Sequence, residues 1–238
     1  ECLKKSKSFD AADAAGNAPV VVTLDLDNTL WKGECKEWPV DSFQRYAEPA
    51  AAEAGGLPSP RKVYDKKNGE FLELYAEVPL VFDALRWAGV PIAIASASPA
   101  ADSARALLSA FGLMNEGDPS LAALQMGEDE DARDGRKVVH IQRLAAQLNL
   151  PEDRFLLFDD GPSNVEKVRE VLHCSALLVA PSVGLTAEVL LRGLEHRLNE
   201  VRMRARHEEA EQREHNPETR RKMKQTGMDR LAQGQAGV

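Results

Sequence analysis

Short apolar runs alternate with helical patterns through the middle of this chain, and this alternation is what most constrains its fold. A run that is apolar at every residue predicts a strand buried on both faces, which is typical of a parallel sheet covered by helices. The predicted strands are Val20–Leu26, Val90–Ala95, Phe155–Phe158, Ala176–Ala180 and a weaker one at Ala122–Met126. The predicted helices are Pro79–Ala88, Ala100–Phe111, Val138–Leu148 and Ser163–Leu172. Their order predicts an α/β fold, a Rossmann-like parallel sheet flanked by helices.

The two ends of the chain differ in composition from this central part. Residues 1–17 are small, polar and aperiodic, which predicts a disordered N-terminal extension. Over residues 199–238 Arg, Glu and Gln dominate, which predicts a charged tail that is helical or disordered. We therefore expect one domain over residues 18–198. It contains an insertion at about 31–78, where prolines and glycines break every strand or helix pattern, and which is too short to form a large cap domain.

Composition excludes several classes of function. The net charge of −8 over 238 residues disfavours nucleic-acid binding through a basic surface. No apolar run approaches the roughly 20 residues that a membrane-spanning helix needs. The cysteines, Cys2, Cys35 and Cys174, are odd in number and lack metal-ligand spacing, which is typical of reduced thiols in an intracellular protein. We expect a cytoplasmic location, with import into an organelle left open, and neither nucleic acid nor membrane as partner. The oligomeric state is open.

Polar side chains follow three of the predicted strands. Asp25 and Asp27 follow the first, Ser96 the second, and Asp159 and Asp160 the third. The carboxyl ends of parallel strands lie at one edge of the sheet, where ligands bind in such folds. Buried carboxylates are costly unless they are paired or bind a cation, and Mg²⁺ prefers oxygen ligands. The sequence therefore predicts one magnesium site at this edge, suited to phosphoryl transfer.

Each acid has a predicted role and an alternative. Asp25 is the candidate nucleophile and Asp27 the candidate general acid–base. The alternatives are a salt-bridged structural aspartate for Asp25 and a helix N-cap for Asp27. Asp25, Asp27 and Asp160 are the predicted Mg²⁺ ligands, with Asp159 supporting them or binding the ion itself.

Three further residues are predicted to bind the phosphate, and a fourth is predicted to support the acids of the site. Ser96 can donate a hydrogen bond to a phosphoryl oxygen, and Asn28 is placed in the same group. Lys137 opposes the helix dipole at a predicted helix start, so neutralising a phosphate would explain its position, with ordinary solvation as the alternative. Asn164 either supports a metal-binding carboxylate or belongs to the N-terminal cap of its helix.

The motifs resemble those of the haloacid dehalogenase (HAD) superfamily of aspartate-nucleophile phosphatases over roughly residues 18–195. The matching residues are Asp25, Asp27 and Thr29 of the first motif, Ser96 of the second, Lys137 of the third, and Asp159 and Asp160 of the fourth. More narrowly, residues 26–31, 74–79, 94–99 and 158–160 are similar to the magnesium-dependent phosphatase subfamily, which has little or no cap. The resemblance implies a HAD-like fold and hydrolysis of phosphomonoesters through an aspartyl-phosphate. The implied substrates are phosphotyrosine-type or sugar-phosphate compounds, as a small molecule or a phosphoprotein. It also implies that Asp27 meets the metal only through its backbone carbonyl.

The chain also departs from that subfamily. Ala97 stands where an arginine usually follows the second-motif serine. The methyl side chain of alanine cannot replace a guanidinium that binds phosphate through two hydrogen bonds. Residues 161–163 are also changed, to Gly-Pro-Ser. Two alternatives are therefore kept: a HAD-like domain of the glyceryl-transfer type, and a catalytically weakened phospho-binding module. Protein tyrosine phosphatase activity is part of the main prediction.

Overall fold

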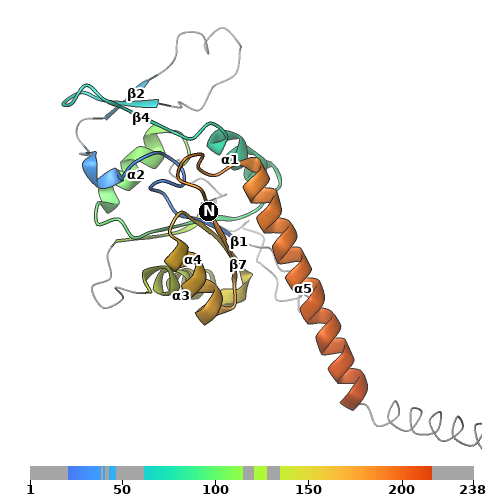
Figure 1. The fold of residues 1–238 in the computed structure, drawn as a ribbon. Coiled ribbons are helices and arrows are strands. Elements are labelled where there is room, and N and C mark those ends of the chain that lie inside the picture. Colours follow the sequence, from blue (N-terminus) through green and yellow to red (C-terminus); the bar gives the residue numbers. More distant parts are fainter. Residues whose placement is uncertain are drawn as a thin grey trace, which may run out of the picture.

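Five parallel strands form the central sheet of the part of the chain that the structure describes (Figure 1). The strands are β1 (Val21–Leu24), β5 (Ile92–Ser96), β6 (Leu121–Met126), β7 (Phe155–Asp159) and β8 (Ser175–Leu178). Their order in the sheet is β6-β5-β1-β7-β8, and every neighbouring pair is parallel. The predicted Rossmann-like α/β fold is therefore confirmed, including the weak strand at Ala122–Met126.

This computed structural model describes residues 21–38, 40, 43–46, 62–114, 121–127 and 135–215. The predicted N-terminal extension at 1–17, part of the insertion, and the tail beyond residue 215 lie outside these residues. The boundaries of the domain, 18–198, stay a prediction.

Helices cover both faces of the sheet because its strands are apolar on both sides. The helices are α1 (Val78–Trp87), α2 (Ala101–Ala110), α3 (Arg136–Leu148), α4 (Pro162–Leu172) and α5 (Ala187–His215). In β7, Leu156 and Phe158 belong to the buried cluster shared with α1, α2 and the start of α5. Phe155 and Leu157 point the other way, into the cluster shared with α3 and α4. The helices thus hold the sheet, and with it the strand ends, between two cores.

Helix α5 lies close to the sheet at one glycine. A Cβ atom added to Gly193 would lie 2.6 Å from Cζ and 2.9 Å from Cε1 of Phe158 in β7. Real Cβ atoms do not approach other heavy atoms this closely, so the helix can take this position only without a side chain here. Gly193 therefore sets how closely α5 docks on the strand that carries Asp159.

The expectation that residues 31–78 carry no strand or helix was wrong for part of this segment. A short 3-10 helix, η1 (Cys35–Glu37), and an antiparallel sheet of β2 (Phe43–Tyr46), β3 (Lys62–Asp65) and β4 (Phe71–Glu73) form there. These strands have three or four residues each, which is too few for a clear alternating pattern. Val63 and Leu72 belong to the main buried cluster, so this small sheet is packed on the domain's own core.

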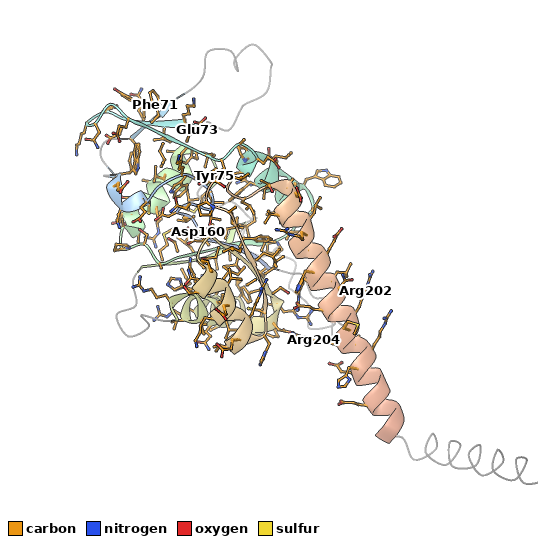
Figure 2. All side chains as sticks on the ribbon, viewed as in Figure 1. Phe71, Glu73, Tyr75, Asp160, Arg202 and Arg204 are labelled. Carbon is orange, nitrogen blue, oxygen red and sulfur yellow. The ribbon has the colours of Figure 1, made fainter. Side chains whose placement is uncertain are left out.

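Beyond its first turns, α5 runs away from the sheet (Figure 1). It passes through Asn199 without interruption. Two side chains tie its middle to the domain: Arg197 is buried beside Asp153, and Arg204 donates to Asp153 at 2.9 Å and to the carbonyl of His173 at 2.8 Å (Figure 2). Among the described residues, no helix combines the length and the apolar character that crossing a membrane requires.

Candidate active site

The site lies at the carboxyl ends of three adjacent strands, β5, β1 and β7. A pocket of about 350 Å³ opens there. Its lining includes Asp25, Asp27, Asn28, Glu34, Lys36, Ser96, Ala97, Ser98, Pro99, Arg136, Lys137, Asp160 and Asn164. The strand order explains the convergence, because β1 occupies the middle of the sheet and its two neighbours end beside it.

Asp25 is held by a buried lysine. Its backbone N–H donates to the carbonyl of Phe158 at 3.0 Å, which continues the pairing of β1 with β7. The ammonium of Lys137, from the first turn of α3, donates to Asp25 Oδ1 and to the carbonyl of Ala95, and pairs with Asp159 Oδ2 at 3.0 Å. An ammonium has three N–H donors, and these three partners match that number. To contact a phosphate, Lys137 would therefore have to give up one of these three partners.

Burial and charge act in opposite directions on this pair. Burial alone lowers the pKa of Lys137, but the carboxylates of Asp25 and Asp159 more than offset it, so the pKa is raised and the lysine stays charged. Burial raises the pKa of the Asp25 carboxyl, and Lys137 opposes that rise. Removing such a lysine would leave buried carboxylates without a counter-charge, at a cost of about 3–5 kcal/mol.

Asp159 lies beneath the pocket and is fully buried. Its Oδ1 accepts hydrogen bonds from the backbone N–H of Gly161 and from Asn164 Nδ2, both at 2.8 Å. Its Oδ2 faces Lys137. Asp159 is therefore held by the start of α4 through Oδ1 and faces the lysine of α3 through Oδ2, and Asn164 supports an acid of the site.

Three carboxylates gather closely enough to share a cation. One ligand oxygen each from Asp25, Asp159 and Asp160 lies within 4.8 Å of the others. Lys137 contacts two of these acids, so its single charge can balance only one of the three when all are ionised. Burial, with the charge of Asp159, also raises the pKa of the Asp160 carboxyl. An all-oxygen donor set with this charge fits a hard divalent cation such as Mg²⁺.

The Asp27 carboxylate turns toward the loop that follows β1. Its Oδ1 accepts from Trp31 Nε1 at 2.9 Å and from the backbone N–H of Cys35 at 2.8 Å. Burial raises the pKa of the Asp27 carboxyl, and the hydrogen bonds from Cys35 and Trp31 oppose the rise. The side chain does not belong to the three-carboxylate cluster. Its assignment as a metal ligand, through side chain or backbone, stays a prediction.

The remaining predicted residues lie around the same pocket. Ser96 is buried at the end of β5, where its Oγ accepts from the backbone N–H of Ser98 at 3.3 Å. Asn28 has a left-handed backbone with φ of 57°, and its Oδ1 accepts from the N–H of Gly33 at 3.1 Å. Ala97 and Arg136 both line the pocket, so a guanidinium is present there although the position after Ser96 lacks one.

Sequence reasoning missed the residues that surround Asp27. Trp31, Cys35 and Ser98 are brought together by tertiary contacts, and the bond between Cys35 Sγ and Ser98 Oγ, 3.0 Å long, joins loops 63 positions apart. Arg136 was missed beside Lys137, although it shares the first turn of the same helix. Its position at that helix start, opposed to the dipole, is the one signal that could have identified it.

Comparison with solved structures finds distant similarities. A phosphatase domain of the Bacteroides fragilis protein BF1531, crystallised with Mg, matches at 18% identity over 73% of this chain and 39% of that chain, with a TM-score of 0.45. A HAD-superfamily hydrolase from Ehrlichia chaffeensis matches at 14% identity over 78% and 97%, with a TM-score of 0.44. CbbY from Rhodobacter sphaeroides, bound to xylulose-(1,5)bisphosphate, matches at 13% identity over 71% and 89%, with a TM-score of 0.46.

The sequence itself gives the assignment. The profile of a family described as Acid Phosphatase matches residues 17–200, which include every strand of the central sheet and all the lining residues of the pocket. The match agrees with the resemblance to phosphatases that the motifs indicated. This chain belongs to the acid phosphatase family.

Proposed function

We propose that this protein hydrolyses phosphomonoesters with Mg²⁺ through an aspartyl-phosphate on Asp25. The observation that carries the proposal is the position of Asp25: it ends the central strand, borders the pocket, contacts Lys137 and shares a three-carboxylate cluster. A carboxylate in this setting can attack phosphorus once the repulsion between two anions is reduced.

Asp25 and Asp160, with Asp159 beside them, would hold the magnesium ion. When bound, the ion neutralises charge on the cluster and on the phosphate, which lowers the repulsion that the nucleophile meets. Lys137 orients Asp25 from the opposite side, because it bridges Asp25, Asp159 and the Ala95 carbonyl. Ser96 and backbone N–H groups at the strand ends would donate to the phosphoryl oxygens.

Two proton transfers by Asp27 complete the cycle. In the first step, an Asp25 oxygen forms a bond to phosphorus while the ester P–O bond breaks. Asp27 gives its proton to the departing oxygen, which leaves as a neutral alcohol. In the second step, the Asp27 carboxylate takes a proton from water as the water oxygen bonds to phosphorus and the Asp25–phosphate bond breaks. Phosphate leaves, and both aspartates return to their starting states.

The pocket suggests a compact phosphate ester of the phosphotyrosine or sugar-phosphate type. A volume of about 350 Å³ accommodates one such group, and Glu34, Lys36 and Arg136 supply charges away from the nucleophile. Arg136 can take part of the anion-binding role for which Ala97 has no side chain. A panel of phosphotyrosine peptides and sugar phosphates, compared by kcat/KM, distinguishes the two substrate types.

The decisive variant is Asp25→Asn, assayed with para-nitrophenyl phosphate and Mg²⁺. Loss of the nucleophile should lower kcat by about a thousandfold or more, since it removes the carboxylate that forms the proposed covalent intermediate. Asp102→Asn, an exposed aspartate on α2, is the matched control and should keep wild-type turnover. Near-wild-type turnover by Asp25→Asn would refute the proposal.

A further inference from the structure

Asp27 is half-buried at the pocket, and its two carboxylate oxygens have different partners. Oδ1 receives two strong donors, the indole N–H of Trp31 at 2.9 Å and the backbone N–H of Cys35 at 2.8 Å. Oδ2 has a single described contact, the Cys35 thiol at 3.5 Å, which is a weak donor. The two oxygens of this carboxylate are therefore chemically unlike.

The groups that bind Oδ1 are themselves rigid. Trp31 is fully buried, and its ring stacks on Phe111 with the centroids 5.9 Å apart. The backbone of Trp31 bridges to Asp27 on one side and to Leu74 on the other. Moving the indole would require repacking of the core, so its N–H is a fixed donor.

Cys35 is also held in place, through a contact with the turn after β5. Its side chain is fully buried, and its Sγ lies 3.0 Å from Ser98 Oγ. Ser98 Oγ also accepts from the backbone N–H of Ala100 at 3.3 Å, at the turn between β5 and α2. The link thus joins the loop after β1 to the turn after β5, and both border the pocket.

We propose that Trp31 and Cys35 are positioning residues for Asp27, which bind Oδ1 and reserve Oδ2 as the atom that exchanges a proton with the substrate. The inference rests on the proposed function, since it assigns the proton transfer of that mechanism to one oxygen. A carboxyl group whose rotation about χ2 is blocked presents its acid oxygen in one direction, and general acid catalysis depends on such alignment.

The first test uses two substrates that differ in their leaving group. Phenyl phosphate needs a proton on its departing oxygen, whereas para-nitrophenyl phosphate leaves as a stable anion. Trp31→Phe keeps the ring on Phe111 and removes the N–H. We expect kcat/KM for phenyl phosphate to fall about tenfold and kcat/KM for para-nitrophenyl phosphate to fall much less, because kcat/KM reports the step in which the leaving group departs.

Cys35 is tested with a rescue. Cys35→Ala removes the contacts to Oδ2 and to Ser98, so it should show the same leaving-group dependence, more weakly than Trp31→Phe because the backbone N–H remains. Cys35→Ser restores a donor of similar reach and should recover most of the lost rate. Trp87→Phe changes the exposed tryptophan of α1 and Cys174→Ala changes the buried cysteine between α4 and β8, and both variants should leave both rates unchanged.

A double-mutant cycle shows whether Trp31 acts through Asp27. In an Asp27→Asn background, Trp31→Phe should have no further effect on kcat, because the group that it positions is already gone. An equal loss in both backgrounds, or an equal loss of kcat/KM for both leaving groups, would overturn the inference and leave the proposed function standing. A wild-type protein that hydrolyses neither phosphate ester overturns both.

Nuclear magnetic resonance provides a readout that does not depend on activity. The chain has three tryptophans, so Trp→Phe variants assign each indole N–H signal. Asp27→Ala should shift the Trp31 signal and speed its exchange with water, while the signal of Trp87, which is exposed on α1, stays in place. An unmoved Trp31 signal would show that the hydrogen bond is absent, which refutes the inference even if Trp31→Phe fails to fold.

Discussion

The four aspartates of the site differ in the partners that surround each one. Asp159 gives both oxygens to protein groups and supports Lys137 and α4. Asp25 shares Lys137 and faces the pocket, and Asp160 joins them in the carboxylate cluster. Asp27 is bound through Oδ1 by Trp31 and Cys35. These different surroundings support the separate roles that we propose for the four side chains.

Cys35 should be unreactive despite its position beside the pocket. Burial raises the pKa of its thiol to about 12, and burial does the same for Cys174. Because the thiolate is the nucleophile, both should resist iodoacetamide at neutral pH in the folded protein and react in urea. Peptide mass spectrometry after timed alkylation measures this. Fast native labelling of Cys35 would mean that the loop after β1 opens, or that the thiol is ionised.

Prediction from sequence succeeded for residues that end apolar strands. Asp25, Ser96 and Asp160 could be placed at one edge because strand direction alone brings them together. The environment of Asp27 could not be predicted, because the turn from Asn28 to Cys35 depends on a left-handed residue and on contacts with distant Ser98. The three partners of Lys137 could not be predicted either, because they come from the ends of three different strands.

At the scale of elements, the site depends on how helices dock against β1, β5 and β7. α3 delivers Lys137 and α4 begins at the groups that bind Asp159. α5 packs on β7 at Gly193, and the N–H of Ala187 at its start donates to Glu77 Oε2 at 2.9 Å. The apolar periodicity of the sequence predicted α3 and α4. It did not predict the small antiparallel sheet, whose strands are too short for a period to appear.

Gly193→Ala should destabilise the protein, although alanine favours helices. Propensity would contribute about 1 kcal/mol in its favour, whereas overpacking against Phe158 costs about 1–3 kcal/mol. We expect a net loss of about 1–2 kcal/mol in the free energy of unfolding, measured by urea denaturation. Phe158→Leu removes the ring atoms that clash, so the two substitutions should be less damaging together than their sum. An increase in stability from Gly193→Ala alone would contradict this docking.

At the scale of the whole molecule, we expect stability and metal binding to be coupled through the acids of the cluster. Burial raises the pKa of Asp25 and of Asp160 above the ordinary value of 3.8. The folded state therefore holds protons there that the unfolded chain has already lost. Stability from these groups is present at low pH and falls as pH rises through their raised pKa values. A bound divalent cation removes this loss by replacing the protons.

The difference in Tm between samples with Mg²⁺ and with EDTA should therefore widen as pH rises from acidic to neutral. Comparing the two samples at each pH cancels the titration of groups elsewhere in the chain. Asp160→Asn removes one charge of the cluster, so it should raise the Tm of the metal-free protein and shrink the difference. Calorimetry measures both effects. A difference that is the same at every pH would exclude this coupling.

The place of β1 in the sheet also has a consequence for the order in which the protein can be made. β1 is the first strand of the central sheet along the chain, yet both of its partners, β5 and β7, are synthesised later. A nascent chain that carries Asp25 therefore has an apolar strand unpaired on both edges until β5 has left the ribosome, and unpaired on one edge until Phe155–Asp159 has followed. Chains that stop before β7 should therefore aggregate or engage chaperones, whereas full-length chains should fold.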